Sequence, residues 1–461
     1  MPNTAPPIWR QWLESSFCVY AFIVFSGAFV TLPLVLNSTG GFTEQQHDPL
    51  SQVCNALILC GTLLFGYWNR TEFVLLLARG RWVNVFWIFA VASLLWSIDR
   101  AVTAWRLIML TTSLMFAFYI VSRFRFEQIL GMLAASTAVC AIASMLTAII
   151  FPAIGKSTPA DPDAWSGVFS HKNQLGWEML AMAIVFIWFA IHDPRRRILA
   201  IAMFGFCLIV AEKSQSATCL VTVGLVLVAT AFLRVLRLPM LPRAWLLLSG
   251  GVITIASGSV ILANLPAVSQ AIGKDPTMTG RTFLWASLIR MLPNRLILGR
   301  GYHAFWTDKN PEAWIIWGRN GWLMHEAHNA YIDAVLSTGL VGLTIACLTL
   351  IVPMIWGVRR CLTDEPIWAD FVFLYCFALT VTNFSETLLY QAGDLHCVLL
   401  PICYLATRAY DLPSRVAAMP PRAMSLKARF LAGGRVATLT ARLAKNDDHG
   451  STATHLTNSS Q

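Results

Sequence analysis

Twelve apolar segments, each about long enough to cross a lipid bilayer, constrain the fold of this chain more than any other feature. They lie at 15–36, 50–67, 82–98, 102–122, 127–151, 173–191, 198–212, 216–235, 244–264, 335–357, 366–384 and 388–407. A helix needs about 20 residues to cross the hydrocarbon core of a membrane. Hydrophobic residues make up 56% and charged residues 13% of the 461 residues, more apolar surface than a soluble domain can bury. The sequence therefore predicts an all-α polytopic membrane protein with about twelve transmembrane helices.

Lysine and arginine residues cluster in alternate loops between these segments. The clusters lie at 70–81, 123–125, 195–197, 234–243 and 359–360, whereas the intervening short loops carry few cationic residues. Cationic loops are retained on the cytoplasmic side of a membrane. We therefore expect both chain termini to be cytoplasmic.

This orientation predicts four regions. Residues 1–264 hold transmembrane helices one to nine, 265–327 form a large outer loop, 328–408 hold helices ten to twelve, and 409–461 form a basic cytoplasmic tail. We expect the tail to be disordered and attracted to anionic lipid headgroups. The net charge of +10 comes largely from this tail and the cytoplasmic loops, so it does not imply a nucleic-acid partner. The 11 cysteines lie mostly inside the predicted spans, which argues against a disulfide framework.

The long outer loop has the sequence features of a folded segment. GRTFLWASLIRML at 280–292 has helical spacing and stops at Pro293. We expect its apolar side chains to lie on the membrane interface, namely Phe283, Leu284, Leu288 and Met291, with Trp285 at headgroup depth. The tryptophans of the loop indicate that it packs against other parts of the chain. Its excess of lysine and arginine permits anion binding, because the planar fork of arginine matches phosphate oxygens.

HEAHNAYID, residues 325–333, holds two histidines and two carboxylates directly before an apolar run. The zinc motif HExxH requires histidines four residues apart, but His325 and His328 are three apart, so we predict no metal site. A His-Asn pair at a helix start can also simply satisfy backbone donors, and the residues alone do not separate this role from catalysis. The position beside a basic loop at the water–lipid boundary favours catalysis. His328 would take a proton from a hydroxyl group there.

Four motifs together resemble the O-antigen ligase and polymerase superfamily, and most closely its exopolysaccharide polymerases of the succinoglycan type. They are GVFSHKNQLG (167–176), GRTFLW (280–285), LGRGYHAFW (298–306) and HEAHNAYIDAVLSTGLVGL (325–343). The resemblance implies a GT-C-like glycosyltransferase architecture in a bacterial inner membrane. It also implies metal-independent transfer, without a cofactor, from an undecaprenyl-diphosphate-linked oligosaccharide to a growing glycan. The implied partners are these two substrates, membrane lipid and other polysaccharide export proteins.

The resemblance also assigns roles to individual residues. His328 matches the family's proposed base, and Arg281 matches an arginine linked to the donor diphosphate. A base that works near pH 7 should be a neutral imidazole, which an unshifted histidine provides. The chain departs from the ligase pattern in EKSQSAT (212–218), where Ala217 stands after the two serines in place of an arginine. This departure favours a polymerase over a ligase.

Further residues could support these roles. We expect the departing diphosphate to be bound by Arg281 with help from Lys172, Lys213 and Arg300. The two lysines could instead anchor helix ends at headgroups, and Arg300 could instead brace its loop. Sugar-binding or supporting roles are predicted for His325, Asn329, Tyr331, His171, Asn173, Asn383 and Glu386.

Three alternatives remain open at this point. An O-antigen ligase would use the same chemistry on a different acceptor. A secondary transporter would also have about twelve spans, but it would predict repeat symmetry and broken helices at midplane, which the sequence does not clearly show. A scaffold of the polysaccharide export complex would have no need for His328 beside a basic loop.

Overall fold

The computed structural model describes residues 7–28, 49–156, 163–242, 244, 246, 281–320, 323–362 and 366–410. Within these residues the chain is nearly all helical, and the only β-pairing there is an isolated bridge between Lys156 and Trp165. Nearly all of the ninth predicted span (244–264), the first part of the long loop, and the basic tail after residue 410 lie outside the described residues.

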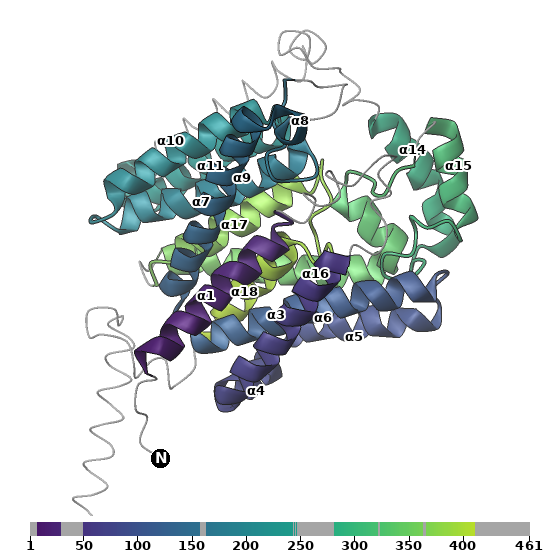
Figure 1. Cartoon of the computed structure of the whole chain (residues 1–461), viewed down its shortest axis with the longest axis horizontal. Helices are drawn as coiled ribbons and strands as arrows, with labels where there is room; N and C mark the ends of the chain where they lie inside the picture. Colours follow the sequence, from purple (N-terminus) through teal and green to yellow (C-terminus); the bar gives the residue numbers. More distant parts are fainter. Residues whose placement is uncertain are drawn as a thin grey trace, which may run out of the picture.

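The helices form a bundle with a smaller helical unit beside it (Figure 1). The bundle helices are α1 Ile8–Phe25, α3 Pro49–Trp68, α4 Arg70–Arg79, α5 Arg81–Ala92, α6 Arg100–Arg123, α7 Phe126–Ile150, α8 Pro152–Gly155, α9 Lys172–His192, α10 Arg197–Lys213, α11 Ala217–Leu236, α16 Ala330–Cys361, α17 Ala369–Thr382 and α18 Leu395–Ala409. The smaller unit contains α14 Arg281–Met291, the 3-10 turn Leu292–Arg295 and α15 Pro311–Asn320.

Six of the described helices are long and apolar enough to cross a membrane, namely α3, α6, α7, α9, α11 and α16. A seventh span arises if α4 and α5, bent by 79°, count as one. Helices α17 and α18 are apolar but shorter. The protein is therefore helical with several spans of membrane length, as an integral membrane protein requires. The figure of twelve spans stays a prediction.

Burial separates the central helices of the bundle from its peripheral ones. In α9, 83% of the apolar window is buried against other helices, whereas in α3 only 28% is buried. Helix α9 packs against α7, α10, α11 and α17, and α18 packs against α6 and α16. A helix that is apolar on every side is stable both in a protein core and next to lipid. Hydropathy alone therefore could not predict which helices are central and which are peripheral.

Among the described residues, four bundle helices have an N-terminal side-chain cap. The caps are Asp99 before α6, His171 before α9, Asn329 before α16 and Asp394 before α18, and each accepts a backbone N–H from the first turn. Such caps satisfy backbone donors that have no partner within the helix. Asp99, His171 and Asn329 lie at span ends that the charge pattern assigns to the outer face, whereas Asp394 lies inside the twelfth predicted span. Polar capping groups therefore gather at this end of the bundle.

The smaller unit is joined to α16 at a break in that helix. Gly339 has φ +68 and ψ −172, which interrupts the helix, and a Cβ built on it would lie 2.1 Å from the carbonyl oxygen of Ile297. The backbone N–H groups of Leu340 and Arg300 donate to the carbonyls of Leu296 and Leu336 at 2.8 and 3.0 Å. Backbone segments can approach this closely only where a side chain is absent.

The smaller unit has a hydrophobic core of its own. Its buried members are Leu284, Leu288, Phe305, Trp306, Ala313, Ile316, Trp317, Met324, Ala327 and Leu336. This corrects one expectation, because Leu284 and Leu288 face this core and not the membrane interface, while Phe283 remains 69% exposed. The ring nitrogen of Trp285 donates to the carbonyl of Ala327 at 2.9 Å. The unit therefore holds the segment before α16 in a defined place.

Candidate functional site

Two loops that are far apart in the sequence meet at the start of α16. The backbone N–H of Ala330 donates to the carbonyls of Asn383 and Glu386 at 3.0 and 3.1 Å. Asn329 caps α16 through its side-chain oxygen and donates its side-chain N–H to the carbonyl of Phe384 at 3.1 Å. These bonds fix the loop after α17 against the histidine-containing loop 325–329.

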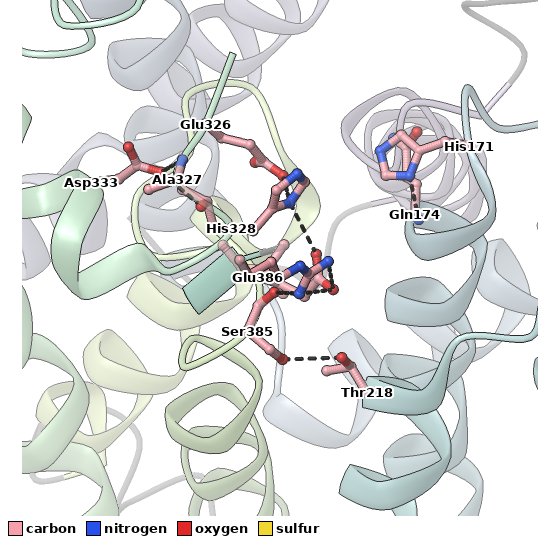
Figure 2. Close-up of polar contacts among 12 residues, drawn as sticks. His171, Gln174, Thr218, Glu326, Ala327, His328, Asp333, Ser385 and Glu386 are labelled. Carbon is pink, nitrogen blue, oxygen red and sulfur yellow. Dashed lines mark hydrogen bonds and ion pairs between the residues drawn. The ribbon is translucent and has the colours of Figure 1, made fainter. Parts of the chain in front are cut away.

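Four charged side chains form a continuous row where these loops meet (Figure 2 labels three of them). Arg281 Nη2 lies 3.3 Å from Glu386 Oε1, and the same guanidinium donates to the carbonyl of Ser385. His328 Nδ1 lies 3.9 Å from Glu386 Oε2 and 2.7 Å from Glu326 Oε1. Positive and negative groups thus alternate from Arg281 through Glu386 and His328 to Glu326. The structure brings together the two residues to which the motifs assigned the main roles.

The protonation of His328 differs from the neutral imidazole expected from the sequence. Burial lowers its pKa, but the carboxylates of Glu326 and Glu386 outweigh burial and raise the pKa to about 10. Burial raises the pKa of Glu326, but the contact with His328 outweighs burial and lowers it. In this arrangement His328 is an imidazolium ion at neutral pH and Glu326 is ionised. This corrects the expectation that the imidazole is neutral near pH 7.

The backbone at His328 is strained. Its φ is +49, a region that residues with a side chain rarely occupy. Such a conformation costs on the order of 1–3 kcal/mol and persists only where the surroundings impose it. Here the cap at Asn329 and the bonds of Ala330 impose it. The strain directs the imidazole toward the carboxylates of both loops.

Asp333, which the sequence argument did not single out, braces the same site. Its carboxylate accepts hydrogen bonds from Trp306 Nε1 at 2.8 Å, the backbone N–H of Ala327 at 2.6 Å and Thr387 Oγ1 at 2.9 Å. It thereby ties the smaller unit, the loop before α16 and the loop after α17 to one side chain. Its place in HEAHNAYID was a signal, since Asp333 and Glu326 are the two carboxylates of that motif.

Three of the residues predicted to bind sugar or support the site make structural hydrogen bonds. Tyr331 donates its hydroxyl to the carbonyl of Thr380 at 2.9 Å, and Asn383 accepts the backbone N–H of Leu388 at 3.0 Å. Asn329 is the cap described above. These three side chains hold the loops in position.

Three predicted residues from the motif GVFSHKNQLG, namely His171, Lys172 and Asn173, lie at the start of α9. His171 caps that helix, accepting the backbone N–H of Gln174 at 3.2 Å. Figure 2 shows His171 across from His328. Lys172 and Asn173 occupy the first turn and are half-buried.

The cationic helpers fall into different environments. Lys213 is 48% exposed at the end of α10 and pairs with its neighbour Glu212 at 3.1 Å. The following segment reaches the site, because the hydroxyls of Thr218 and Ser385 lie 3.0 Å apart (Figure 2). Arg300 is only 2% exposed, pairs with Glu312 and donates to the carbonyl of Met291 at 2.9 Å. This corrects the donor-binding prediction for Arg300, since a guanidinium sealed inside the smaller unit cannot reach a lipid diphosphate.

One group of residues within the described part of the chain has the composition of a metal ligand set. Glu326, His328 and Glu386 each offer an atom within 4.8 Å of the others. Arg281 already pairs with Glu386, and the imidazolium of His328 already pairs with Glu326. A divalent cation would have to displace one cation and deprotonate the other. Because the two carboxylates are already paired with two organic cations, binding of a metal ion would gain little free energy here.

Comparison with known proteins adds to this geometry. Residues 198–347 match the family model described as O-antigen ligase. The resemblance to the O-antigen ligase and polymerase superfamily is confirmed. The matched segment contains Arg281, Glu326, His328 and Asp333 but ends before Glu386.

The chain is also similar to the exopolysaccharide production protein ExoQ of Rhizobium meliloti (strain 1021). The two are 26% identical over 309 residues, which cover 62% of this chain and 66% of the relative, just under two thirds of its length.

Proposed function

We propose that the protein transfers glycan from a polyprenyl-diphosphate-linked oligosaccharide to a growing polysaccharide at the periplasmic face of a bacterial inner membrane. The observation that carries this proposal is the meeting of Arg281 and His328 at Glu386, at 3.3 and 3.9 Å. A phosphate-matching cation and a proton-transfer group are the two parts that such a transfer requires. The similarity to an exopolysaccharide production protein and to the O-antigen ligase family supports the same chemistry.

The reaction breaks the bond between the anomeric carbon and the diphosphate oxygen and forms a bond to the acceptor oxygen. The leaving diphosphate takes the bonding electron pair, and the acceptor hydroxyl loses its proton. Arg281 stabilises the charge that develops on the leaving oxygen, which preorganised donors do without reorganisation. The guanidinium must then exchange Glu386 for phosphate oxygens, and its 18% exposure leaves it accessible.

His328 takes the proton in its neutral form. Because Glu326 and Glu386 hold a proton on the imidazole in the substrate-free protein, the base forms when one of these carboxylates turns away and the ring proton passes to water. Glu326 is the better candidate, since it is the closer of the two and its hydrogen bond is the largest contribution that raises the pKa. Acceptor hydroxyls that bind Glu326 would release the imidazole. Base formation is thereby coupled to the arrival of the acceptor.

Replacement of Arg281 and His328 by alanine tests this proposal. We expect each variant to lower kcat/KM by about 10²-fold or more, the usual loss when a charge-stabilising donor or a proton-transfer group is removed. Arg290→Ala is a matched control, because Arg290 is exposed on the same helix and has no contact with the four charges. The assay measures polymer from purified lipid-linked repeat units with full-length protein in nanodiscs. Undiminished polymer from both site variants would contradict the mechanism.

Two further measurements separate the remaining alternatives. A chelator should leave transfer intact, and loss of activity that a divalent ion restores would overturn the metal-independent mechanism. A polymerase extends the repeat-unit chain, whereas an O-antigen ligase places one glycan on a separate lipid acceptor. Product length with repeat units as the sole substrate distinguishes the two.

A further inference from the structure

A pocket lies directly beside the row of charges and shares Glu326 and Asp333 with the site described above. Its lining includes Glu326, His325, His303, Trp306 and Gln391. Arg281, Glu386 and His328 do not line this pocket.

The walls of the pocket are aromatic and firmly held. Phe86 stacks on Tyr390 with ring centroids 3.9 Å apart, and the Tyr302 hydroxyl donates to the carbonyl of Tyr390 at 2.7 Å. Phe305 and Trp306 meet edge to face at 4.8 Å. The electron-rich faces of such rings attract the C–H groups of a sugar ring, which carry partial positive charge.

Between these rings the pocket presents polar groups with hydrogen-bonding capacity to spare. Within the described residues, His325 Nδ1 is buried without a hydrogen-bond partner, and the Gln391 side chain makes no hydrogen bond. His303 Nε2 is 3.4 Å from the carbonyl of Tyr390, a long contact. Burial lowers the pKa of His303 to about 3, so its ring is neutral and can hydrogen-bond to an uncharged partner. A buried polar atom without a partner costs free energy unless a ligand or water satisfies it.

The position of the pocket relative to Arg281 indicates which substrate it takes. In a displacement at the anomeric carbon, the attacking hydroxyl and the leaving diphosphate lie on opposite sides of that carbon. Arg281 lies at one end of the row of charges, and Glu326 lies at the other end and lines the pocket. The diphosphate therefore belongs at the Arg281 end, and the attacking sugar belongs at the pocket end.

We infer that this pocket binds the terminal sugar residue of the glycan acceptor and presents its hydroxyl to the Glu326–His328 pair. The inference deepens the proposed function and rests on it. Aromatic walls would set the plane of the sugar ring, and His325, His303 and Gln391 would select its hydroxyl pattern. Glu326 would bind an acceptor hydroxyl and so loosen its hold on His328.

The test uses full-length protein in nanodiscs with two separate substrates. The donor is a purified undecaprenyl-diphosphate-linked repeat unit, and the acceptor is a soluble oligosaccharide obtained by partial acid hydrolysis of the polymer that the host secretes. Gln391→Ala and His325→Ala should each raise the acceptor KM about three- to tenfold, as expected for loss of one hydrogen bond. The donor KM and the kcat at saturating acceptor should change by less than about twofold.

Direct binding of the acceptor oligosaccharide without donor, measured by calorimetry, should weaken by the same factor in both variants. Asp308→Ala is the control, because Asp308 is exposed in the same unit and does not line the pocket. Thermal unfolding checks that the variants fold. If His325→Ala does not fold, Gln391→Ala alone tests the pocket.

The outcomes separate this inference from the proposed function. A rise in the donor KM alone, or unchanged acceptor binding in folded variants, would overturn the acceptor site while transfer by the wild type still supports the function. Absence of transfer by the wild type, with Arg281→Ala indistinguishable from it, would instead overturn the function.

Discussion

Glu326→Gln separates the electrostatic role of this carboxylate from its shape, because glutamine keeps the size and most hydrogen bonds but removes the charge. At 2.7 Å, the attraction between Glu326 and the His328 imidazolium is about 6 kcal/mol for an effective dielectric constant of 20. The same calculation for Glu386 at 3.9 Å gives about 4 kcal/mol. Neither value includes the free-energy cost of removing the charges from water, which cancels much of the attraction. Glu326 is therefore the larger of two comparable contributions.

The variant should lower the pKa of His328 from about 10 by about one to three pH units, the usual effect of one adjacent opposite charge. The neutral imidazole is the base, so kcat/KM of the wild type should rise with pH toward about 10. In Glu326→Gln the rise should level off at a lower pH. At pH 7, kcat/KM of the variant should then be a larger fraction of its own high-pH value than in the wild type. This fraction should increase about tenfold for each unit by which the His328 pKa falls.

The assay is the pH dependence of kcat/KM for transfer, together with ring-nitrogen NMR of histidine-labelled protein in nanodiscs. The His328 signal is identified by its loss in His328→Asn. Glu127→Gln, a partly exposed carboxylate at the start of α7, is the control and should leave both curves unchanged.

Two results would refute the reasoning in different ways. If the His328 pKa does not move, the contact at 2.7 Å does not govern its protonation. If the pKa falls but transfer is lost at every pH, Glu326 itself receives the proton, and His328 is the positioning cation.

Three further predictions concern stability. The pKa of His328 is about 10 in the folded protein and near 6.5 in the unfolded chain. The stabilisation of the fold by protonated His328 is therefore complete below about pH 6.5 and is lost as pH rises through 10. The unfolding temperature of the wild type should fall over this pH range more than that of His328→Asn. Arg300→Met should cost about 1–3 kcal/mol, because Glu312 loses its guanidinium partner and keeps only the hydrogen bond from Asn294. Chemical unfolding of the Arg300→Met/Glu312→Met double variant should recover part of this loss, whereas additive losses would show that the pair is not coupled. Gly339→Ala should cost at least about 2 kcal/mol, since its Cβ meets the Ile297 carbonyl and its φ is +68; an unchanged unfolding temperature would contradict this docking geometry.

Some features of this protein can be predicted from short stretches of consecutive residues. Apolar runs and arginine clusters are properties of consecutive residues, so they predict helices and a membrane without knowledge of the packing. The motifs around Arg281 and His328 are local as well, and the similarity to the O-antigen ligase family over 198–347 agrees with the resemblance they indicated. The span count depends on how helices bend and on residues outside the described part, and it stays a prediction.

Only the tertiary structure decided what those residues meet. The pKa of His328 depends on two carboxylates within 4 Å, and one of them, Glu386, comes from a loop more than fifty residues away along the chain. The sequence left Arg300 either as a helper of Arg281 or as a brace of its loop, and the structure buries it inside the smaller unit while Arg281 faces the site. The physical reason is that hydropathy sums over residues that are neighbours in the sequence, whereas steric contacts and electrostatic interactions depend on distances between residues in three dimensions. Sequence therefore determined the membrane fold and the candidate groups, and packing determined their charge, their partners and the pocket beside them.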